Sequence, residues 1–327
     1  MNRSISSIFN ESQFKSFVVA LYRRWSRYLG IILSLVLISA IFSLLTPIYL
    51  TGQNLINIAQ QAVINSIVAL GMTVVIISGG IDLSVGSIVA LTSLIVAQNM
   101  AEKSIPSALL IGIAVGIICG LINGGLISYL KLQPFLVTLG TMSLYRGLAL
   151  IFCNGLPIRN IPSAFLVGMN ALNNSFPIPV IIMFAFSLLI GFLMRKTVIG
   201  EYIFAIGGNE EATRLSGIRV NEIKVLGYVI SAIACTIAGI IFISRLGVAD
   251  PQAGIGYELE AIAAAAVGGA SLSGGKGSIL GTIIGALLLS AIRNGLTLLN
   301  VQAFYQYVAV GIIIIIAISI DRFSRKA

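Results

Sequence analysis

Long apolar runs, separated by short stretches of glycine, proline, asparagine and charged residues, dominate the chain. A helix needs about 20 predominantly apolar residues to cross the roughly 30 Å hydrocarbon core of a bilayer. Because lipid offers backbone groups no hydrogen-bond partners, such runs predict helices. The pattern therefore predicts an all-α polytopic membrane protein with about ten transmembrane helices. The predicted spans are residues 29–50, 55–78, 84–101, 105–128, 134–154, 177–194, 224–244, 257–272, 277–300 and 304–320.

Basic residues gather on one side of the predicted membrane. With the N-terminus in the cytoplasm, fifteen Lys and Arg residues fall inside, whereas only Lys103, Arg159 and Arg245 fall outside. Cytoplasmic loops carry an excess of Lys and Arg, so both termini are predicted to be cytoplasmic. The predicted domains are a cytoplasmic tail at 1–28, one transmembrane domain at 29–321 with a cytoplasmic loop at 195–223, and a second cytoplasmic tail at 322–327.

Composition supports a membrane protein and excludes several other classes. The 327 residues are 57% hydrophobic and 9% charged, against roughly a quarter charged in soluble domains. The net charge of +9 comes from basic residues at the ends of apolar runs, so nucleic acid is not an expected partner. The absence of histidine excludes histidine-based metal sites and the usual histidine-containing catalytic sets. We therefore expect neither an enzyme nor a metal site.

A charged loop follows the sixth predicted span. Within GEYIFAIGGNEEATRLSGIRVNEIK, residues 200–224, Asn209 is placed to cap a helix whose first turn holds Glu210 and Glu211, where the helix dipole favours acids. Gly217 offers a left-handed stop two turns later. The loop predicts a short cytoplasmic helix joined to a span at each end. Such a helix is suited either to being moved by a partner protein or to acting as a solvated connector.

Two glycine-rich breaks interrupt the apolar pattern in similar ways. They are GGIDLSVGSI at 79–88 and GGKGSI at 274–279, and each reopens into an apolar run with Gly-Ser-Ile. Both fall on the predicted cytoplasmic side, which is compatible with a parallel internal repeat. Glycine and serine are also common wherever membrane helices pack closely. The residues of this structural motif are Gly80, Asp82, Ser84, Gly86, Gly274, Gly275 and Gly277.

Asp82, in the first break, has two candidate roles. Its carboxylate can cap the helix that opens at Leu83, and the flanking glycines allow backbones to approach closely. An ionisable residue at membrane depth is a functional candidate, but the predicted topology places Asp82 near the inner surface. A structural cap is the favoured interpretation, and an ion or proton role is the alternative.

Polar residues follow one face of the second predicted span. Asn54, Asn57, Gln61 and Asn65 are spaced by three or four residues, so they share a helix face. The stripe either lines an aqueous path or joins neighbouring helices by hydrogen bonds. Amides both donate and accept, which suits an uncharged polyhydroxy solute. Arg293 and Asn294, in the ninth predicted span, are similar candidates, although Arg293 could instead pair with an acid or a carbonyl. The candidate path residues are Asn57, Gln61, Asn65, Arg293 and Asn294.

The segment GGASLSGGKGS at 268–278 does not form a nucleotide site. A P-loop needs glycine, four residues and then Gly-Lys-Ser/Thr, whereas here position 270 is alanine and position 277 is glycine. We therefore expect no cofactor in this chain.

Three segments of the chain resemble one family. They are NLINIAQQAVINSIVALGMTVVIISGGIDLSVGS, the inner loop at 200–224, and GYELEAIAAAAVGGASLSGGKGSILGTIIGALLLSAIRNGLTLLNV, which is followed by a Tyr-Gln pair. These segments resemble the membrane permeases of bacterial ABC importers for ribose and other simple sugars, which are related to the branched-chain amino-acid permeases. The resemblance extends from about Pro47 to Asp321.

The resemblance implies a type II-like ABC importer permease that crosses the bacterial inner membrane many times. It implies a second permease copy, as a homodimer or close heterodimer, cytoplasmic ATPase subunits that bind ATP and Mg, and a periplasmic sugar-binding protein. In such permeases a cytoplasmic Glu-Ala-Ala, three residues, Gly element docks into the ATPase. Glu211, Ala212 and Gly217 match that element after the Asn209 cap. Thr213 replaces the second alanine, which is a conservative departure.

Other classes stay open on the residues alone. A secondary, ion-coupled transporter would need an acid near the midplane of the membrane. A membrane-bound enzyme would need a nucleophile and a base. Within the family, ribose is the first expected solute, followed by xylose, arabinose, galactose or a signalling sugar. Nucleosides and branched-chain amino acids are further alternatives, because the binding protein supplies most of the selectivity.

Overall fold

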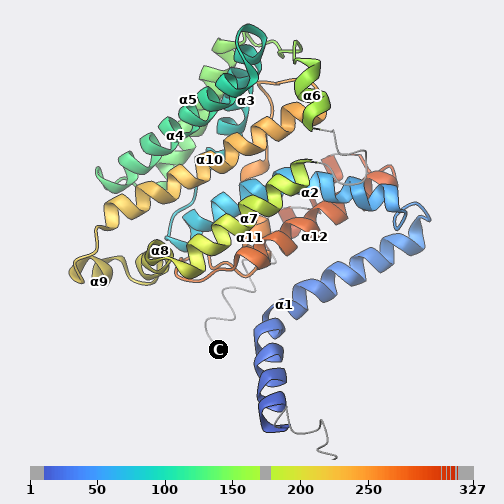
Figure 1. Cartoon of the computed structure of the whole chain (residues 1–327), viewed down its shortest axis with the longest axis vertical. Helices are drawn as coiled ribbons and strands as arrows, with labels where there is room; N and C mark the ends of the chain where they lie inside the picture. Colours follow the sequence, from blue (N-terminus) through green and yellow to red (C-terminus); the bar gives the residue numbers. More distant parts are fainter. Residues whose placement is uncertain are drawn as a thin grey trace, which may run out of the picture.

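Figure 1 shows the computed structural model of the chain, a bundle of helices of unequal length. The structure describes residues 11–169 and 178–302, together with 304–306, 308–309, 311–313 and 315, and for 11–27 it describes the backbone alone. In these parts of the chain, α1 to α12 and the helical residues within 304–315 form the regular structure, and the sole β feature is an isolated antiparallel bridge between Ile158 and Ala249. The all-α prediction is confirmed for the described residues.

Eight helices of the described chain are long and apolar enough to cross a membrane. The polytopic membrane protein is thereby confirmed, and most helix ends fall within a few residues of the predicted spans. The first helix differs, because it begins at Glu11 and not at position 29. The eight are α1 (Glu11–Leu45), α2 (Gly52–Ile77), α3 (Val85–Glu102), α4 (Ile105–Ser128), α5 (Pro134–Phe152), α7 (Ile178–Lys196), α10 (Val220–Leu246) and α12 (Ile279–Leu298).

Two predicted spans are not among these eight. The run at 257–272 forms α11 (Tyr257–Val267), whose 11 residues extend about 16 Å at 1.5 Å per residue, too short to cross a bilayer. The helix is shorter than predicted because the chain turns at Gly268 and at Gly269, which has a φ of 86°, a conformation open mainly to glycine. In the last predicted span, 304–320, the described residues 304–306, 308–309, 311–313 and 315 are helical, and the others lie outside the described part of the chain.

Local capping chemistry sets several helix ends. The side chain of Thr51 accepts the backbone N–H of Asn54 at the start of α2, and Ser278 does the same for Gly281 at the start of α12. At the other end of α10, Gly247 adopts a left-handed conformation with a φ of 67°. These are the usual residues for such caps, because serine and threonine hydroxyls accept free N–H groups and glycine tolerates positive φ.

The core of the bundle lies around α2. Of the most apolar stretch of each helix, 83% is buried in α2 and 72% in α3, but only 11% in α1 and 22% in α5. Helices α10, α11 and α12 pack against α2, while α3 and α4 pack on the far side of α10 (Figure 1). The exposed apolar sides of α1 and α5 therefore face lipid or another protein.

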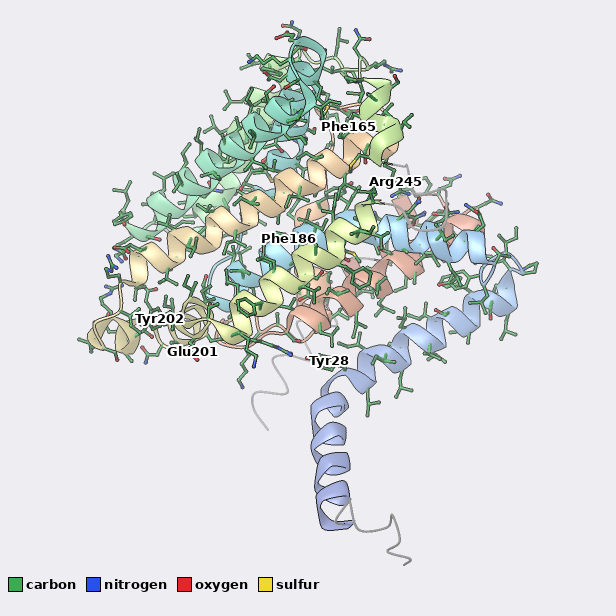
Figure 2. The ribbon with its side chains drawn as sticks, viewed as in Figure 1. Tyr28, Phe165, Phe186, Glu201, Tyr202 and Arg245 are labelled. Carbon is green, nitrogen blue, oxygen red and sulfur yellow. The ribbon has the colours of Figure 1, made fainter. Side chains whose placement is uncertain are left out.

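The short helices mark the two ends of the bundle. α8 (Val198–Gly208) and α9 (Glu210–Leu215) lie at one end, and α6 (Ser163–Met169) lies at the other (Figure 1). Figure 2 shows Arg245, at the end of α10, far from Glu201 and Tyr202 on α8. The charged inner loop and the long outer connection of the predicted topology are thus at opposite ends.

Candidate translocation and coupling sites

The charged inner loop folds into α8 and α9, which connect α7 to α10. Asn209 is the N-cap of α9, and its Oδ1 accepts the backbone N–H of Ala212 at 2.9 Å. Gly217 follows the helix with a φ of 83°. The prediction of a short capped helix is confirmed, and its start and stop follow from the residues that the sequence places there.

One side of α9 is anchored and the other is free. Glu210 forms ion pairs with Arg214 at 2.7 Å and with Lys224 of α10 at 2.9 Å. Partial burial alone would raise the pKa of the Glu210 carboxyl, but the hydrogen bond and charge of Lys224, with the charges of Lys131 and Arg214, outweigh it and lower the pKa. Glu211 is 70% exposed. Glu210 therefore ties α9 to α10, while Glu211 points to solvent.

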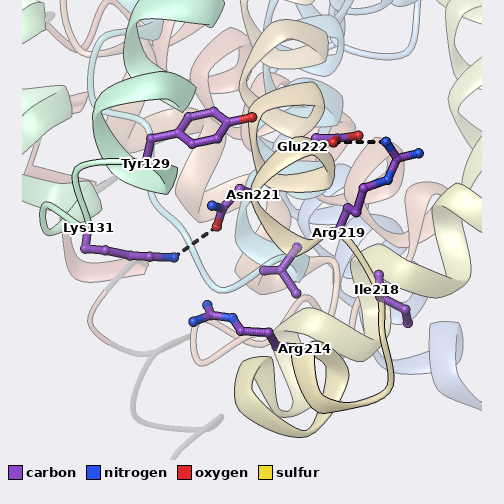
Figure 3. Close-up of a pocket in the computed structure, with 8 residues that line it drawn as sticks. Tyr129, Lys131, Arg214, Ile218, Arg219, Asn221 and Glu222 are labelled. Atoms are coloured by element: carbon purple, nitrogen blue, oxygen red, sulfur yellow. Dashed lines mark hydrogen bonds and ion pairs between the residues drawn. The ribbon is translucent and has the colours of Figure 1, made fainter.

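A cavity of about 340 Å³ opens beside α9, between the end of α4 and the start of α10. Figure 3 shows Lys131 donating a hydrogen bond to Asn221, at 2.9 Å, and Arg219 paired with Glu222, at 3.2 Å. Tyr129 contributes an aromatic ring to the same lining. Residues that follow α4 thus lie beside α9 and line the same exposed cavity.

The two glycine-rich breaks contact each other and the end of α8. The backbone N–H of Gly275 donates to the carbonyl of Ile77 at 2.9 Å. A Cβ on Gly207 would lie 1.7 Å from that same oxygen, and one on Gly274 would lie 3.1 Å from Cα of Gly79. Only glycine permits such close backbone contact. We call this contact the glycine junction, formed by Ile77, Gly79, Gly207, Gly274 and Gly275.

Asp82 is fully buried within the protein. Its Oδ1 accepts the N–H and the hydroxyl of Ser84 at 3.0 and 2.6 Å, and its Oδ2 accepts the hydroxyl of Ser231 of α10 at 3.0 Å. Asn123 of α4 donates to the Ser84 hydroxyl at 2.8 Å. The carboxylate thus holds the turn before α3, which begins at Val85, slightly later than predicted, and links it to α10.

The remaining glycines of the motif also sit at close contacts. A Cβ on Gly86 would lie 2.0 Å from the carbonyl oxygen of Gly254, and one on Gly80 would lie 2.5 Å from the Tyr228 hydroxyl. On Gly277 it would lie 2.6 Å from side-chain atoms of α2. Close packing therefore accounts for these glycines, and an internal repeat stays a prediction.

Three of the five candidate path residues line one cavity of about 250 Å³. Gln61 and Asn65 come from α2 and Arg293 from α12. Arg293 forms an ion pair with Glu260 of α11, and Nδ2 of Asn65 donates to the same carboxylate at 2.5 Å. The alternative that Arg293 pairs with an acid is confirmed. We call this cavity the polar pocket; its lining is Gln61, Ile64, Asn65, Arg245, Tyr257, Ser290, Arg293 and Thr297.

The other two candidates lie elsewhere. Asn294 is 5% exposed, and its Oδ1 accepts Nδ2 of Asn54 at 2.9 Å. Asn57 is half-buried, one helical turn before Gln61, and is not part of the pocket lining. The polar stripe of α2 therefore divides into two parts. Asn54 joins α2 to α12, and the stretch from Gln61 to Asn65 faces the polar pocket.

Three site residues that the sequence did not indicate are Glu260, Ser290 and Gly207. Glu260 is buried beneath the polar pocket, and Ser290 lines it. Gly207 belongs to a Gly-Gly pair within the charged loop, and that pair was the one signal for its role. All three depend on contacts between helices distant in the sequence.

The described residues form an all-helical, multi-pass membrane protein with a polar pocket between its helices and a capped helix at one end. A protein-family profile described as "Branched-chain amino acid transport system / permease component" matches residues 54–318. The match covers most of the chain, and the chain belongs to this family. No solved structure matches it.

Several curated relatives are import permeases. The chain is 42% identical over 295 residues to the ribose import permease protein of Escherichia coli K12, covering 89% of this chain and 92% of the relative. It is 43% identical over 299 residues to the ribose import permease protein of Bacillus subtilis, covering 90% and 92%. It is 37% identical over 318 residues to the D-allose transport system permease protein of E. coli K12, covering 96% and 97%.

Proposed function

We propose that the chain is the permease subunit of an ATP-binding-cassette importer that carries a monosaccharide, ribose or a similar sugar, across the bacterial inner membrane. The observation that carries this proposal is 42% identity to a ribose import permease over 89% of the chain. The D-allose relative points to the same class of solute. The chain is a multi-pass protein of that membrane and a transporter, not an enzyme.

The proposed partners follow from this class. α9 docks into a cytoplasmic ATPase subunit, which binds ATP and Mg in place of this chain. A periplasmic sugar-binding protein delivers the sugar to the opposite face, and a second permease copy completes the transport unit.

The proposed topology has both termini in the cytoplasm, with α8, α9 and the two glycine-rich breaks at the cytoplasmic face. The chain then crosses the membrane about ten times, with α11 and the residues that follow it together making one crossing. The excess of Lys and Arg on that side supports this orientation.

The proposed mechanism couples α9 to the polar pocket through two rigid contacts. The Glu210 to Lys224 ion pair ties α9 to α10, and the glycine junction ties α8 to the breaks that end α2 and precede α12. A displacement of α9 by the ATPase therefore reaches the helices that line the pocket. Alternating access needs such a movement of helices around a site between them.

The decisive experiment measures ATP-driven uptake of labelled D-ribose into proteoliposomes that contain the permease, its ATPase and its binding protein. Glu211→Ala should reduce uptake by about tenfold or more, the effect of losing one central interface residue. Its unfolding temperature should stay unchanged, because an exposed surface pair contributes little stability. Glu102→Ala, on an exposed acid at the far end of α3, is the control and should transport normally.

Two results would contradict these assignments separately. Normal uptake by Glu211→Ala would remove α9 as the ATPase contact. Sugar accumulation by the permease alone, dependent on an ion gradient and independent of any ATPase, would remove the importer function and support a secondary transporter.

A further inference from the structure

The polar pocket contains a hydroxyl that the protein itself leaves unsatisfied. Ser290 of α12 is 2% exposed, and its Oγ has no hydrogen-bond partner in the described part of the chain. A serine within a helix commonly bonds the carbonyl one turn earlier, as Ser187 does with Met183 at 2.6 Å. Ser290 lines the pocket instead. Because an unpaired buried polar group is unfavourable, this hydroxyl indicates that a polar ligand enters.

The pairing of Arg293 with a buried acid favours a neutral ligand. Arg293 is paired with Glu260, which is 5% exposed, and Asn65 donates to the same carboxylate. An anion would have to compete with Glu260 for Arg293. The guanidinium of Arg293 has five N–H donors. Its ion pair with Glu260 engages Nη2, so other N–H groups of Arg293 can donate to a ligand. The other cation, Arg245, is exposed and donates to the backbone of α2 at 3.4 Å.

The rest of the lining combines donors, acceptors and apolar surface. Gln61 is half-buried and its amide makes no side-chain hydrogen bond to the described residues. Ile64 contributes aliphatic surface and Tyr257 an aromatic ring. A sugar ring needs the same combination, since each hydroxyl both donates and accepts while the C–H faces are apolar. The volume of about 250 Å³ is below the roughly 300–1,000 Å³ typical for drug-sized ligands.

We propose that the polar pocket is a binding site of the permease itself for one neutral monosaccharide ring. Ser290, Gln61 and Arg293 hydrogen-bond its hydroxyl groups, and the Glu260 pair fixes the orientation of Arg293. This assignment rests on the proposed function and extends it, because recognition then belongs to the permease as well as to the binding protein. The affinity is weak, since a transport site must also release its solute.

The test is equilibrium binding of labelled D-ribose to the full-length permease in lipid nanodiscs, without ATPase or binding protein. We expect saturable binding in the millimolar range, displaced by unlabelled D-ribose and D-allose. Ribose 5-phosphate, which carries the same ring with a charge, should displace it less well. Tighter binding of the phosphate would overturn the assignment of a neutral ligand.

Two serines provide a matched pair of variants. Ser290→Ala should weaken D-ribose binding about three- to tenfold, the effect of one hydrogen bond. Ser66 of α2 also has a buried and unpaired hydroxyl, with 0% exposure, but it does not line the pocket. Ser66→Ala should therefore bind as the wild type does. Gln61→Leu, which removes another lining amide, should also weaken binding, while unfolding temperatures report whether each variant is folded.

The outcomes separate this inference from the proposed function. Absence of saturable D-ribose binding, or equal binding by the Ser290→Ala and Ser66→Ala variants, overturns the site even if the complete importer takes up ribose. Absence of ATP-driven ribose uptake by the complete wild-type importer overturns the proposed function, whatever the isolated permease binds.

Discussion

At the scale of single residues, Asp82 shows how a buried charge is held by neutral donors. Its oxygens accept three hydrogen bonds, from the N–H and hydroxyl of Ser84 and from the hydroxyl of Ser231. Among the described ion pairs, none involves Asp82. A buried carboxylate is unfavourable unless its lone pairs are satisfied. Asp82 therefore acts as a structural link between the turn before α3 and helix α10.

This role predicts a loss of stability in Asp82→Asn, because the new amide presents a donor where three donors already converge. We expect a lower unfolding temperature, with about 1–3 kcal/mol lost for each buried donor left unpaired. A thiol-reactive dye can follow unfolding, since Cys119 and Cys235 are free and buried. Asp250→Asn is the control, because Asp250 accepts the N–H of Gln252 at 2.8 Å at an exposed site. Equal unfolding temperatures for both variants would contradict the structural role.

Helix periodicity predicts some residues of the polar pocket and cannot predict the others. Spacing places Gln61 and Asn65 on one face of a span, and the structure brings both to the pocket lining. Glu260 lies 195 residues from Asn65 in the sequence, so no spacing rule relates them. Ser290 has the appearance of an ordinary small residue in a span. Its proposed role rests on a hydroxyl without a hydrogen-bond partner among the described residues, and only the packed structure shows this.

At the scale of elements, apolar composition predicts where helices occur better than it predicts where each helix ends. The spans that form α2, α4 and α10 can be predicted from the sequence because each has a long apolar run with polar ends. The run at 257–272 is also apolar, yet its helix stops at Val267. The close backbone contacts around Gly268 decide this, since a Cβ there would lie 2.5 Å from backbone atoms of α12. Helix caps, by contrast, are local, and Asn209 and Gly217 were predicted correctly.

The glycine junction gives the element-scale prediction. In Gly207→Ala the new Cβ would lie 1.7 Å from the Ile77 carbonyl oxygen and 2.4 Å from the Gly275 nitrogen, so α8 must move away and the Gly275 to Ile77 hydrogen bond is disturbed. We expect ATP-driven sugar uptake to fall by about tenfold or more, as for other contacts whose precise geometry is lost. Uptake is measured in proteoliposomes at equal amounts of inserted protein.

Gly208→Ala is the matched control for this contact. A Cβ at Gly208 meets no atom within 4 Å, and alanine favours a helix more than glycine does. Gly208→Ala should therefore transport as the wild type does, with equal or higher stability. Normal uptake by the Gly207→Ala variant would show that the junction does not transmit the movement of α9.

At the scale of the whole molecule, the two ends of the bundle differ in basic charge. Lys131 lines the cavity beside α9, Lys196 ends α7 where it leads into α8, and Lys276 lies in the second glycine-rich break. At the opposite end, Arg245 closes α10 (Figure 2) and Arg159 lies next to the bridge between Ile158 and Ala249. Because Lys and Arg resist transfer across the membrane, we propose that the cation-rich end is the cytoplasmic one.

This orientation predicts which cysteines a membrane-impermeant maleimide reaches. In a chain without its three native cysteines, Arg159→Cys should react in intact spheroplasts, because position 159 is exposed at the outer end. Glu211→Cys should react only after the membrane is opened, although the side chain at 211 is 70% exposed. A chain that keeps Cys119 alone should stay unlabelled in both conditions, since this residue is 3% exposed. Labelling of position 211 in intact spheroplasts would invert the orientation and separate α9 from any cytoplasmic ATPase.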